Sequence, residues 1–171
     1  MTPDILTIGY EGADLDSFLS TLALAGVEHL VDVRDLPISR KRGFSKSSLA
    51  LALNAAGIRY THLKALGDPK AGRDAMKQGD YQAFLAIYSA HIATDSAQKA
   101  LDEAADIARS ARTVLLCYER NPKECHRSLV VEHLQGRESF GVRHLGVQKG
   151  SSSLNKTSAK CTMPARPEAH A

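Results

Sequence analysis

Short apolar runs alternate with segments of helical periodicity along most of the chain. Short runs of this kind are typical of β-strands, and the amphipathic segments between them are typical of α-helices. The run TVLLCY is continuously apolar, which favours a strand covered on both faces. The predicted strands span residues 5–8, 29–33, 58–63, 113–118 and 142–145.

Each predicted helix carries apolar residues on one face and a recognisable start or stop signal. Asp14 and Asp80 are good N-caps, and Ser96 and either Ser45 or Ser47 can cap two further helices. The predicted helices lie near 15–22, 49–56, 81–88, 97–110 and 127–135, and glycine follows three of them. Strands separated by helices predict an α/β fold, a single domain with a mostly parallel sheet flanked by helices.

Length and composition restrict the class of protein. A chain of 171 residues, 43% hydrophobic and 24% charged, suits one globular domain and argues against disorder throughout. Three cysteines are too few, and odd in number, for a disulfide scaffold. No apolar run is long enough to span a membrane, and the first residues lack the features of a secretory signal. We therefore expect a cytoplasmic protein without membrane attachment.

The formal net charge of +3 comes from the C-terminal segment, residues 146–171. This segment holds four basic residues against one acidic residue, so the preceding 145 residues are neutral overall. It is rich in Ser, Lys, Ala and Pro and has no hydrophobic period, which predicts a disordered basic tail. We therefore expect an α/β domain at 1–145 and a tail at 146–171. The alternative for the tail is a basic arm that binds nucleic acid.

The residues that follow the predicted strands are the candidates for a functional site, because parallel α/β sheets bind ligands at the carboxyl ends of their strands. Gly9, Tyr10, Glu11 and Gly12 follow the first strand. The glycines allow a tight turn and the close approach of a ligand, so Tyr10 and Glu11 are candidate binding residues. The alternative is an ordinary strand-to-helix turn, which the spacing alone favours.

The second strand leads into a basic segment of 13 residues that begins at Arg34 and carries a net charge of +4. Arg34 and Arg40 could surround an anion together with Ser39, Ser45 and free amides at the start of the next helix. The alternative is a solvated basic loop. Asp32 lies within the strand itself. A buried carboxylate there needs a partner, and a nearby arginine is the natural one.

The third strand presents Tyr60 and His62 on one face, because strand side chains alternate. His62 lies at the strand end, where an imidazole could act as a general base or bind a polar ligand. The alternative for His62 is a structural role, which is more common for a single histidine.

The segment CYERNPKECHRS after the fourth strand is the most informative part of the chain. Glu119 lies where the strand opens to solvent. Cys125, His126 and Arg127 fall at the start of a helix, where free amides and the positive helix end favour an anion. The same field predicts a lowered pKa for Cys125, which would suit a nucleophilic or redox thiol. The alternative is that Cys125 or His126 caps the helix while Arg127 pairs with a nearby carboxylate.

A zinc site is not predicted. Cys117, Cys125 and His126 lack the spacing of a zinc ribbon or finger. Neighbouring side chains at a helix start also diverge by about 100°. Cys117 can instead be a small hydrophobic residue of the core.

Four segments together resemble one known family, DUF488, in order and spacing. They are TIGYEG, LVDVRDLPISRKRGFS, GIRYTHLKALG and VLLCYERNPKECHRSLVVEHL, and the resemblance covers residues 5–145. It implies a compact intracellular bacterial or archaeal α/β protein, and it implies no activity because the family is defined as having unknown function. The motif positions it carries over are Gly9, Tyr10, Glu11, Gly12, Asp32, Arg34, Pro37, Ser39, Arg40, Phe44, Ser45, Tyr60, His62, Gly67, Cys117, Glu119, Cys125, His126 and Arg127.

A fainter similarity links the chain to the rhodanese pattern. In that family a cysteine at the end of an apolar strand opens an anion-binding loop that an arginine closes, and Cys117 and Arg127 would take those parts. The loop here is longer than in rhodaneses and contains Pro122 and Glu124. Glu119 beside a persulfide would also repel its charge.

Three hypotheses of function follow from these patterns. The first is an enzyme or sensor that binds a phosphorylated small molecule or nucleic acid. The second is a non-enzymatic binding or adaptor module, and the third is a rhodanese-like thiol enzyme that uses Cys125 or Cys117. No cofactor or oligomeric state is indicated. In the first hypothesis Arg34, Arg40 and Arg127 hold the anion, and Glu119 and His62 are the acid–base candidates. Across the hypotheses the candidate catalytic residues are Glu119, Cys125, His126 and His62. The candidate ligand-binding residues are Gly9, Tyr10, Glu11, Arg34, Ser39, Arg40, Phe44, Ser45, Tyr60 and Arg127.

Overall fold

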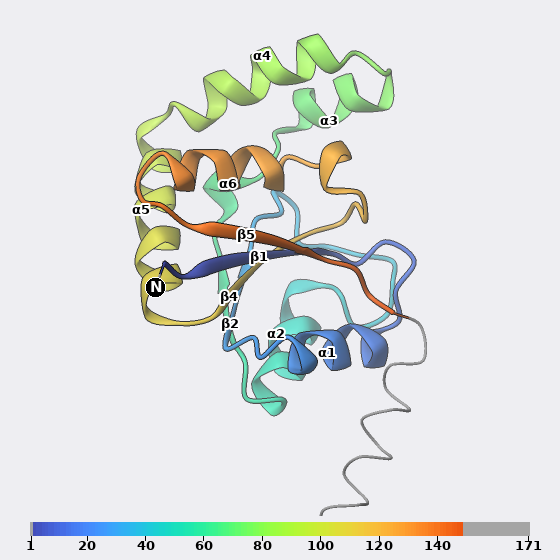
Figure 1. Ribbon diagram of the computed structural model, residues 1–171. Helices are drawn as coiled ribbons and strands as arrows, with labels where there is room; N and C mark the ends of the chain where they lie inside the picture. The colour runs from blue at the N-terminus through green and yellow to red at the C-terminus, as the bar shows by residue number, and fades with distance from the viewer. Residues whose placement is uncertain (1, 149–171) are drawn as a thin grey trace, which may run out of the picture.

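Five parallel strands form one sheet in the computed structural model, which describes residues 2–148 (Figure 1). The order across the sheet is β3-β2-β4-β1-β5, so β4 lies at the centre and all of its residues are buried. The α/β prediction and the five predicted strands are confirmed. The strands are β1 (Asp4–Gly9), β2 (His29–Asp32), β3 (Arg59–His62), β4 (Thr113–Cys117) and β5 (Gly141–Leu145).

Successive side chains of each strand enter two separate hydrophobic cores, because side chains alternate between the faces of a sheet. Leu6 and Leu116 belong to one core, with α1 (Leu15–Leu24) and α2 (Lys46–Ala55). Ile5 and Leu115 belong to the other core. Its helices are α3 (Lys70–Lys77), α4 (Tyr81–Ile92), α5 (Asp95–Ser110) and α6 (Arg127–Gln135), which lie on the opposite side of the sheet from α1 and α2 (Figure 1).

At the middle of the sheet, neighbouring strands are followed by helices that cover opposite faces of the sheet. Strands β1 and β2 are followed by α1 and α2 on one face, whereas β4 is followed by α6 on the other. Because β4 lies between β1 and β2, the chain leaves neighbouring strand ends toward opposite faces. In open α/β sheets such a switch point leaves a crevice beyond the carboxyl ends of the strands.

Asp14, Asp80 and Ser45 are N-cap residues as predicted, but the Ser45 side chain makes no capping hydrogen bond. Asp14 accepts a hydrogen bond from the Ser17 amide at 2.8 Å, and Asp80 accepts one from Ala83 at 3.0 Å. The prediction of Ser96 as a cap is wrong, since Thr94 is the N-cap of α5. The extended backbone of Thr94 allows its hydroxyl to reach the Ala97 amide, so the helix begins before residue 96.

Helix α3 and the short 3-10 helices η1 (Lys64–Leu66) and η2 (Pro122–Glu124) were not predicted. Helix α3 has eight residues, of which Gly72 and Ala75 are buried. A helix with so small an apolar face leaves almost no periodic signal in the sequence. This omission matters because α3 and the residues before it contribute to the site.

The predicted tail lies mostly outside the described residues, since 149–171 are not among them. Val147 is described and is buried in the core with Leu6 and Phe18. In the described part of the chain, no helix is both long enough and apolar enough to cross a membrane.

Candidate functional site

A cavity of about 320 Å³ opens beyond the carboxyl ends of β1, β2 and β4, where the topology places a crevice. Its walls come from the residues that follow these strands, from the segment leading into α3, and from the start of α6. From the candidate residues chosen on sequence, the cavity gathers Tyr10, Arg34, Ser39, Arg40, Glu119 and His126. It adds Cys117, which was considered as a reactive thiol.

Arg34 is held by a buried ion pair with Asp32. The guanidinium donates from Nε to Asp32 Oδ1 at 2.9 Å and from Nη2 to Oδ2 at 2.7 Å. The Tyr60 hydroxyl also donates to Asp32 Oδ2, at 2.6 Å, and burial raises the pKa of Tyr60. The predicted need of Asp32 for an arginine partner is therefore confirmed. Most donors of Arg34 are used within the protein.

Tyr10 and Phe44 pack face to face beneath Arg34. Their ring centroids are 4.5 Å apart with planes 8° from parallel. Arg34 Nη1 donates to the Tyr10 hydroxyl at 3.3 Å and to the Phe44 carbonyl at 2.7 Å. The pair therefore fixes the wall between β1 and the segment after β2, and Phe44 is fully buried within it.

Two cysteines and one histidine meet at the floor of the cavity. His126 Nδ1 lies 3.6 Å from Cys117 Sγ and 3.9 Å from Cys125 Sγ. The other ring nitrogen, Nε2, donates to the Val33 carbonyl at 2.7 Å. Cys117 Sγ in turn donates to Glu119 Oε2 at 3.0 Å. Cys117 and His126 line the cavity, while the buried Cys125 is not among its lining residues.

The predicted divergence of the side chains of Cys125 and His126 is wrong. Cys125 has extended backbone angles (φ −133°, ψ 141°) and precedes the helix, and His126 is the N-cap of α6 without a side-chain capping bond. The side chains of Cys125 and His126 can therefore both point toward Cys117. The ligand-type atoms of these two residues and Cys117 all lie within 4.8 Å of one another.

The pKa values at this floor also differ from expectation. A lowered pKa was expected for Cys125, but burial raises the pKa of its thiol well above the usual value. Burial acts to lower the pKa of His126, but the adjacent Cys125 sulfur and the bond to Val33 outweigh it and raise that pKa to about 9. The positive helix end does not activate Cys125, because the side chain points into the protein interior.

Arg127 is fully buried and binds neutral oxygens. Its Nε donates to Thr7 Oγ1 at 3.1 Å, its Nη1 donates to the Glu119 carbonyl, and its Nη2 donates to the Arg120 carbonyl at 3.0 Å. Arg127 therefore ties α6 to β1 and to the loop after β4. It is not among the residues that line the cavity.

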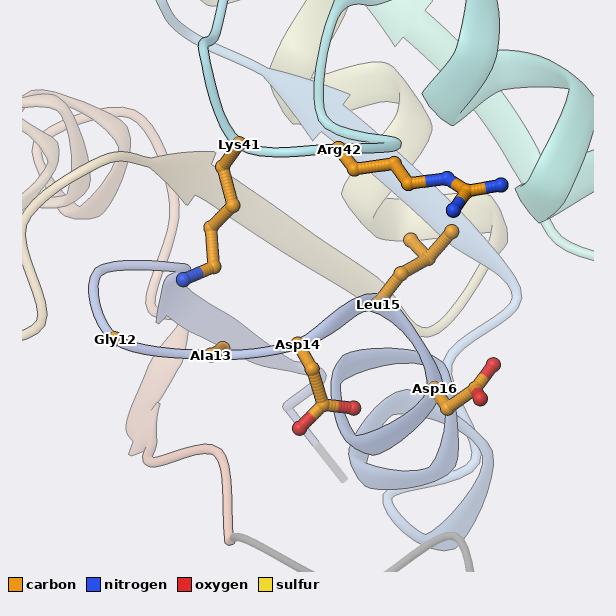
Figure 2. A pocket seen from close by; sticks show the side chains of 7 residues that line it. All are labelled: Gly12, Ala13, Asp14, Leu15, Asp16, Lys41 and Arg42. Atoms are coloured by element: carbon orange, nitrogen blue, oxygen red, sulfur yellow. The ribbon is translucent and has the colours of Figure 1, made fainter.

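The basic segment after β2 divides between two pockets. Arg40 lines the strand-end cavity, whereas Lys41 and Arg42 border a larger pocket of about 610 Å³. Figure 2 shows these two side chains across from Asp14 and Asp16 at the start of α1. This second pocket contains no thiol, imidazole or aromatic group, so the strand-end cavity is the better candidate for chemistry.

Ser39 and Ser45 are linked to each other across the base of the same loop. Ser45 Oγ accepts from the Ser39 amide at 3.0 Å and donates to the Ser39 carbonyl at 3.2 Å. The Lys46 amide, at the start of α2, donates to the Pro37 carbonyl. These bonds hold the loop closed and use groups that were expected to surround an anion.

The remaining sequence-chosen residues lie away from the cavity floor. Glu11 Oε2 accepts from the Arg120 amide at 3.0 Å. His62 Nε2 donates to the Arg34 carbonyl at 2.7 Å. Gly9 ends β1 against the loop after β4, where a Cβ atom would lie 1.8 Å from the Glu119 carbonyl oxygen. All three shape the backbone around the site.

Asp68 and Arg73 line the cavity and were missed on sequence. Arg73 Nη1 donates to Asp35 Oδ2 at 2.8 Å and to the Asp68 carbonyl at 2.6 Å. Asp68 is buried, and its Oδ1 has no hydrogen-bond partner among residues 2–148. Burial raises the pKa of Asp68 to about 6. The sequence signal that could have found this segment is the Asp-Pro pair before α3, which is typical of a helix start.

The rim of the cavity is apolar and open to solvent. Leu36, Ile38 and Tyr118 line it and are 53%, 77% and 48% exposed. Tyr118 also contacts the edge of the Tyr10 ring, with centroids 5.2 Å apart. Exposed apolar side chains gathered at the mouth of a polar cavity indicate a surface for an apolar or aromatic part of a ligand.

Comparison with known proteins identifies the family of the chain. The chain matches no curated protein, and no solved structure matches it. The sequence model of the family described as Domain of unknown function DUF488 matches residues 14–134, which is most of the chain and includes the carboxyl ends of β2 and β4 and the whole of α3. The chain therefore belongs to the DUF488 family.

Proposed function

We propose that this protein is a cytoplasmic enzyme that binds a small phosphorylated ligand, of nucleotide size, in the strand-end cavity. The observation that carries the proposal is the arrangement of three kinds of group around one cavity. Guanidinium groups line the cavity together with exposed apolar side chains, a thiol, an imidazole and a carboxylate. Cys117 and Cys125 are both free thiols.

Arg40 is the residue proposed to hold the phosphate. It lines the cavity and is exposed, and it has no ion pair or hydrogen bond with another described residue. A guanidinium suits phosphate because its planar fork donates two parallel hydrogen bonds. Arg73 stands in the same cavity but is already paired with Asp35. Arg34 and Arg127 are excluded from this role by their internal bonds.

The size and rim of the cavity favour a ligand with an aromatic part. A volume of about 320 Å³ lies at the lower end of the range for small-molecule sites, roughly 300–1,000 Å³. Tyr118, Leu36 and Ile38 offer apolar surface on which a base could pack. The phosphate would then face Arg40, and the reacting atom would face the floor.

Glu119 and His126 are the proposed acid–base pair at the floor. Both line the cavity, and Glu119 contacts the Cys117 thiol between them. When a carboxylate and an imidazole lie close to one reacting position, one of them can accept a proton from the ligand while the other donates a proton to it. His62 is not assigned a catalytic role, because its ring binds the Arg34 carbonyl outside this cavity.

The test is ligand binding to the wild type and to two variants of the same loop. Phosphorylated nucleotides, the matching nucleosides and short oligonucleotides are screened by thermal shift and then by calorimetry. We expect a nucleotide to bind and Arg40→Gln to weaken it at least about tenfold, since a charge-assisted hydrogen bond contributes about 1.5–3 kcal/mol. Arg42→Gln is the matched control, because Arg42 borders the other pocket. Equal weakening by both variants would contradict the proposal.

The same protein samples distinguish the proposed enzyme from two alternatives, a non-enzymatic binding module and a thiol enzyme. A binding module would bind the ligand without converting it, so product analysis after prolonged incubation would find only unchanged ligand. A thiol enzyme is favoured by the position of Cys117 in the cavity beside His126. It predicts that an alkylating reagent modifies Cys117 or Cys125 faster than it modifies Cys161.

A further inference from the structure

We infer that Cys117, Cys125 and His126 form a binding site for one divalent transition-metal ion, with zinc as the best match, and that the fourth position of the ion opens into the strand-end cavity. The inference goes beyond the proposed function and does not depend on phosphate binding. With a metal on Nδ1 and Nε2 on the Val33 carbonyl, His126 has no free nitrogen, so Glu119 alone would move the proton in the metal-bound protein. The inference rests on the arrangement of the three side chains at the floor, and binding of metal without any phosphorylated ligand would leave it standing.

The separations between the ligand atoms fit a tetrahedral ion. With metal–sulfur bonds of about 2.3 Å and metal–nitrogen bonds of about 2.0 Å, tetrahedral angles place a sulfur and a nitrogen about 3.5 Å apart and two sulfurs about 3.8 Å apart. His126 Nδ1 lies 3.6 Å from Cys117 Sγ and 3.9 Å from Cys125 Sγ. All three atoms lie within 4.8 Å of one another, so a small shift of Cys125 completes the geometry.

The orientation of His126 is already that of a metal ligand. Its Nε2 donates to the Val33 carbonyl at 2.7 Å, so Nδ1 is the nitrogen that faces both sulfurs. Metal-binding histidines generally donate their second nitrogen to a carbonyl or carboxylate, which fixes the ring and its tautomer. Tyr88 packs against the ring, with centroids 5.6 Å apart, and restricts its rotation further.

The Oδ1 atom of Asp68, which is buried without a hydrogen-bond partner among the described residues, is a second, independent observation. Asp68 is 7% exposed and lines the same cavity as Cys117 and His126. A buried carboxylate without a partner is costly, and a nearby cation would offset that cost. Glu119, 3.0 Å from Cys117 Sγ, adds a second carboxylate to the same side.

The donor set selects the class of metal. Two thiolates and one imidazole suit zinc and other borderline or soft ions, and they disfavour magnesium and calcium, which prefer oxygen. Sites with three protein ligands keep a fourth position for water or substrate, whereas closed four-ligand sites are structural. Because Cys117 and His126 line the cavity and Cys125 is not among its lining residues, the vacant position faces the cavity, beside Glu119.

The experiment measures metal binding by the full chain. The protein is purified under reducing conditions, freed of metal with a chelator and titrated with zinc and with cobalt(II). We expect one equivalent to bind. The cobalt form is expected to show intense tetrahedral bands in the visible region and a thiolate-to-cobalt charge-transfer band in the near ultraviolet. A cobalt spectrum without the charge-transfer band would overturn the inference.

Variants locate the ligands. Cys117→Ser, Cys125→Ser and His126→Gln are each expected to weaken zinc binding by at least about 100-fold, above the range for loss of a supporting group. Cys161→Ser and His133→Gln are the matched controls, since residue 161 lies outside the described chain and His133 is exposed on α6. Loss of the charge-transfer band in Cys161→Ser, with the band retained in the Cys117 and Cys125 variants, would overturn the assignment.

Two further measurements show whether a loss of metal binding comes from the loss of a ligand or from unfolding of the variant. Circular dichroism of each metal-free variant shows whether it is folded, and the Cys161→Ser protein tests the two body thiols without any change to the core. If the reduced protein binds no metal and instead forms a Cys117–Cys125 disulfide with a mild oxidant, the site is a redox pair and the inference fails. Nucleotide binding to Arg40→Gln is measured separately, so failure of either proposal is recognised by itself.

Discussion

Arg34 donates two parallel hydrogen bonds to Asp32, and both side chains are buried within the wall of the cavity. The pair joins the end of β2 to Tyr10 and Phe44 on one side and to Tyr60 of β3 on the other. A buried charge is tolerated only while its partner is present. The pair is therefore a structural support of the site rather than a free anion-binding group.

We predict that Arg34→Met destabilises the protein by about 3–5 kcal/mol, because it leaves the Asp32 carboxylate buried without its counter-charge. Urea unfolding followed by circular dichroism measures the change. The double variant Asp32→Asn/Arg34→Met is expected to recover part of the loss, since the uncompensated charge is gone. If the double variant is less stable than Arg34→Met, the charge is not the cause of the loss.

Gly9→Ala is expected to destabilise the fold by at least about 2 kcal/mol through overpacking. An added Cβ would lie 1.8 Å from the Glu119 carbonyl oxygen, and that oxygen belongs to the backbone and cannot rotate away. Thermal unfolding of the two proteins gives the difference. Gly146→Ala is the control, because the nearest atom to its added Cβ would be a flexible Arg120 side-chain nitrogen at 3.7 Å, and it should leave the unfolding midpoint almost unchanged.

Arg127→Met is expected to cost about 2–4 kcal/mol, since it leaves the oxygen of Thr7 and two backbone carbonyls without their buried donor. Arg127→Lys should recover only part of this stability, because one ammonium cannot reproduce the three directions of the guanidinium. Denaturant unfolding of both variants is compared with that of Arg120→Met, in which an exposed side chain is removed. A loss in Arg120→Met as large as that in Arg127→Met would contradict the assignment.

The pH dependence of stability is expected to include a contribution from His29. Burial, and then the charge of Arg59, lower the pKa of His29, whose Nε2 lies 2.8 Å from Thr61 Oγ1. The unfolded chain therefore takes up a proton at higher pH than the folded protein, and stability is lost as the pH falls below about 6.5 toward the folded pKa. His29→Gln should show a shallower decline between pH 7 and pH 5 in denaturant titrations. Parallel profiles for the two proteins would show that His29 makes no contribution.

The strands and most helices could be predicted from sequence because their signals are local. The continuous apolar run that becomes β4 and the capping residues Asp14 and Asp80 each act within a few residues. The order of the strands has no such local signal. Helix α3 was missed because its eight residues bury only Gly72 and Ala75, so Asp68 and Arg73 were missed with it.

The place of the cavity in the fold could be predicted from the sequence, but the contacts and roles of the side chains around it could not. The cavity opens at the strand ends, where Arg34, Cys117 and Glu119 all lie. The roles of the arginines depend on partners far along the chain, such as the Glu119 carbonyl that Arg127 binds and the Phe44 carbonyl that Arg34 binds. The convergence of Cys125 and His126 depends on two backbone conformations before α6, which residue spacing does not reveal.

The hydrogen bond from His126 to the Val33 carbonyl joins positions 93 residues apart. During synthesis on the ribosome, the end of β2 emerges long before the start of α6. The nascent chain therefore cannot assemble the floor of the cavity until the start of α6 has been translated. A chain that ends after β2 would leave the Val33 carbonyl without this partner, so the floor of the cavity forms only once residues far beyond β2 have emerged.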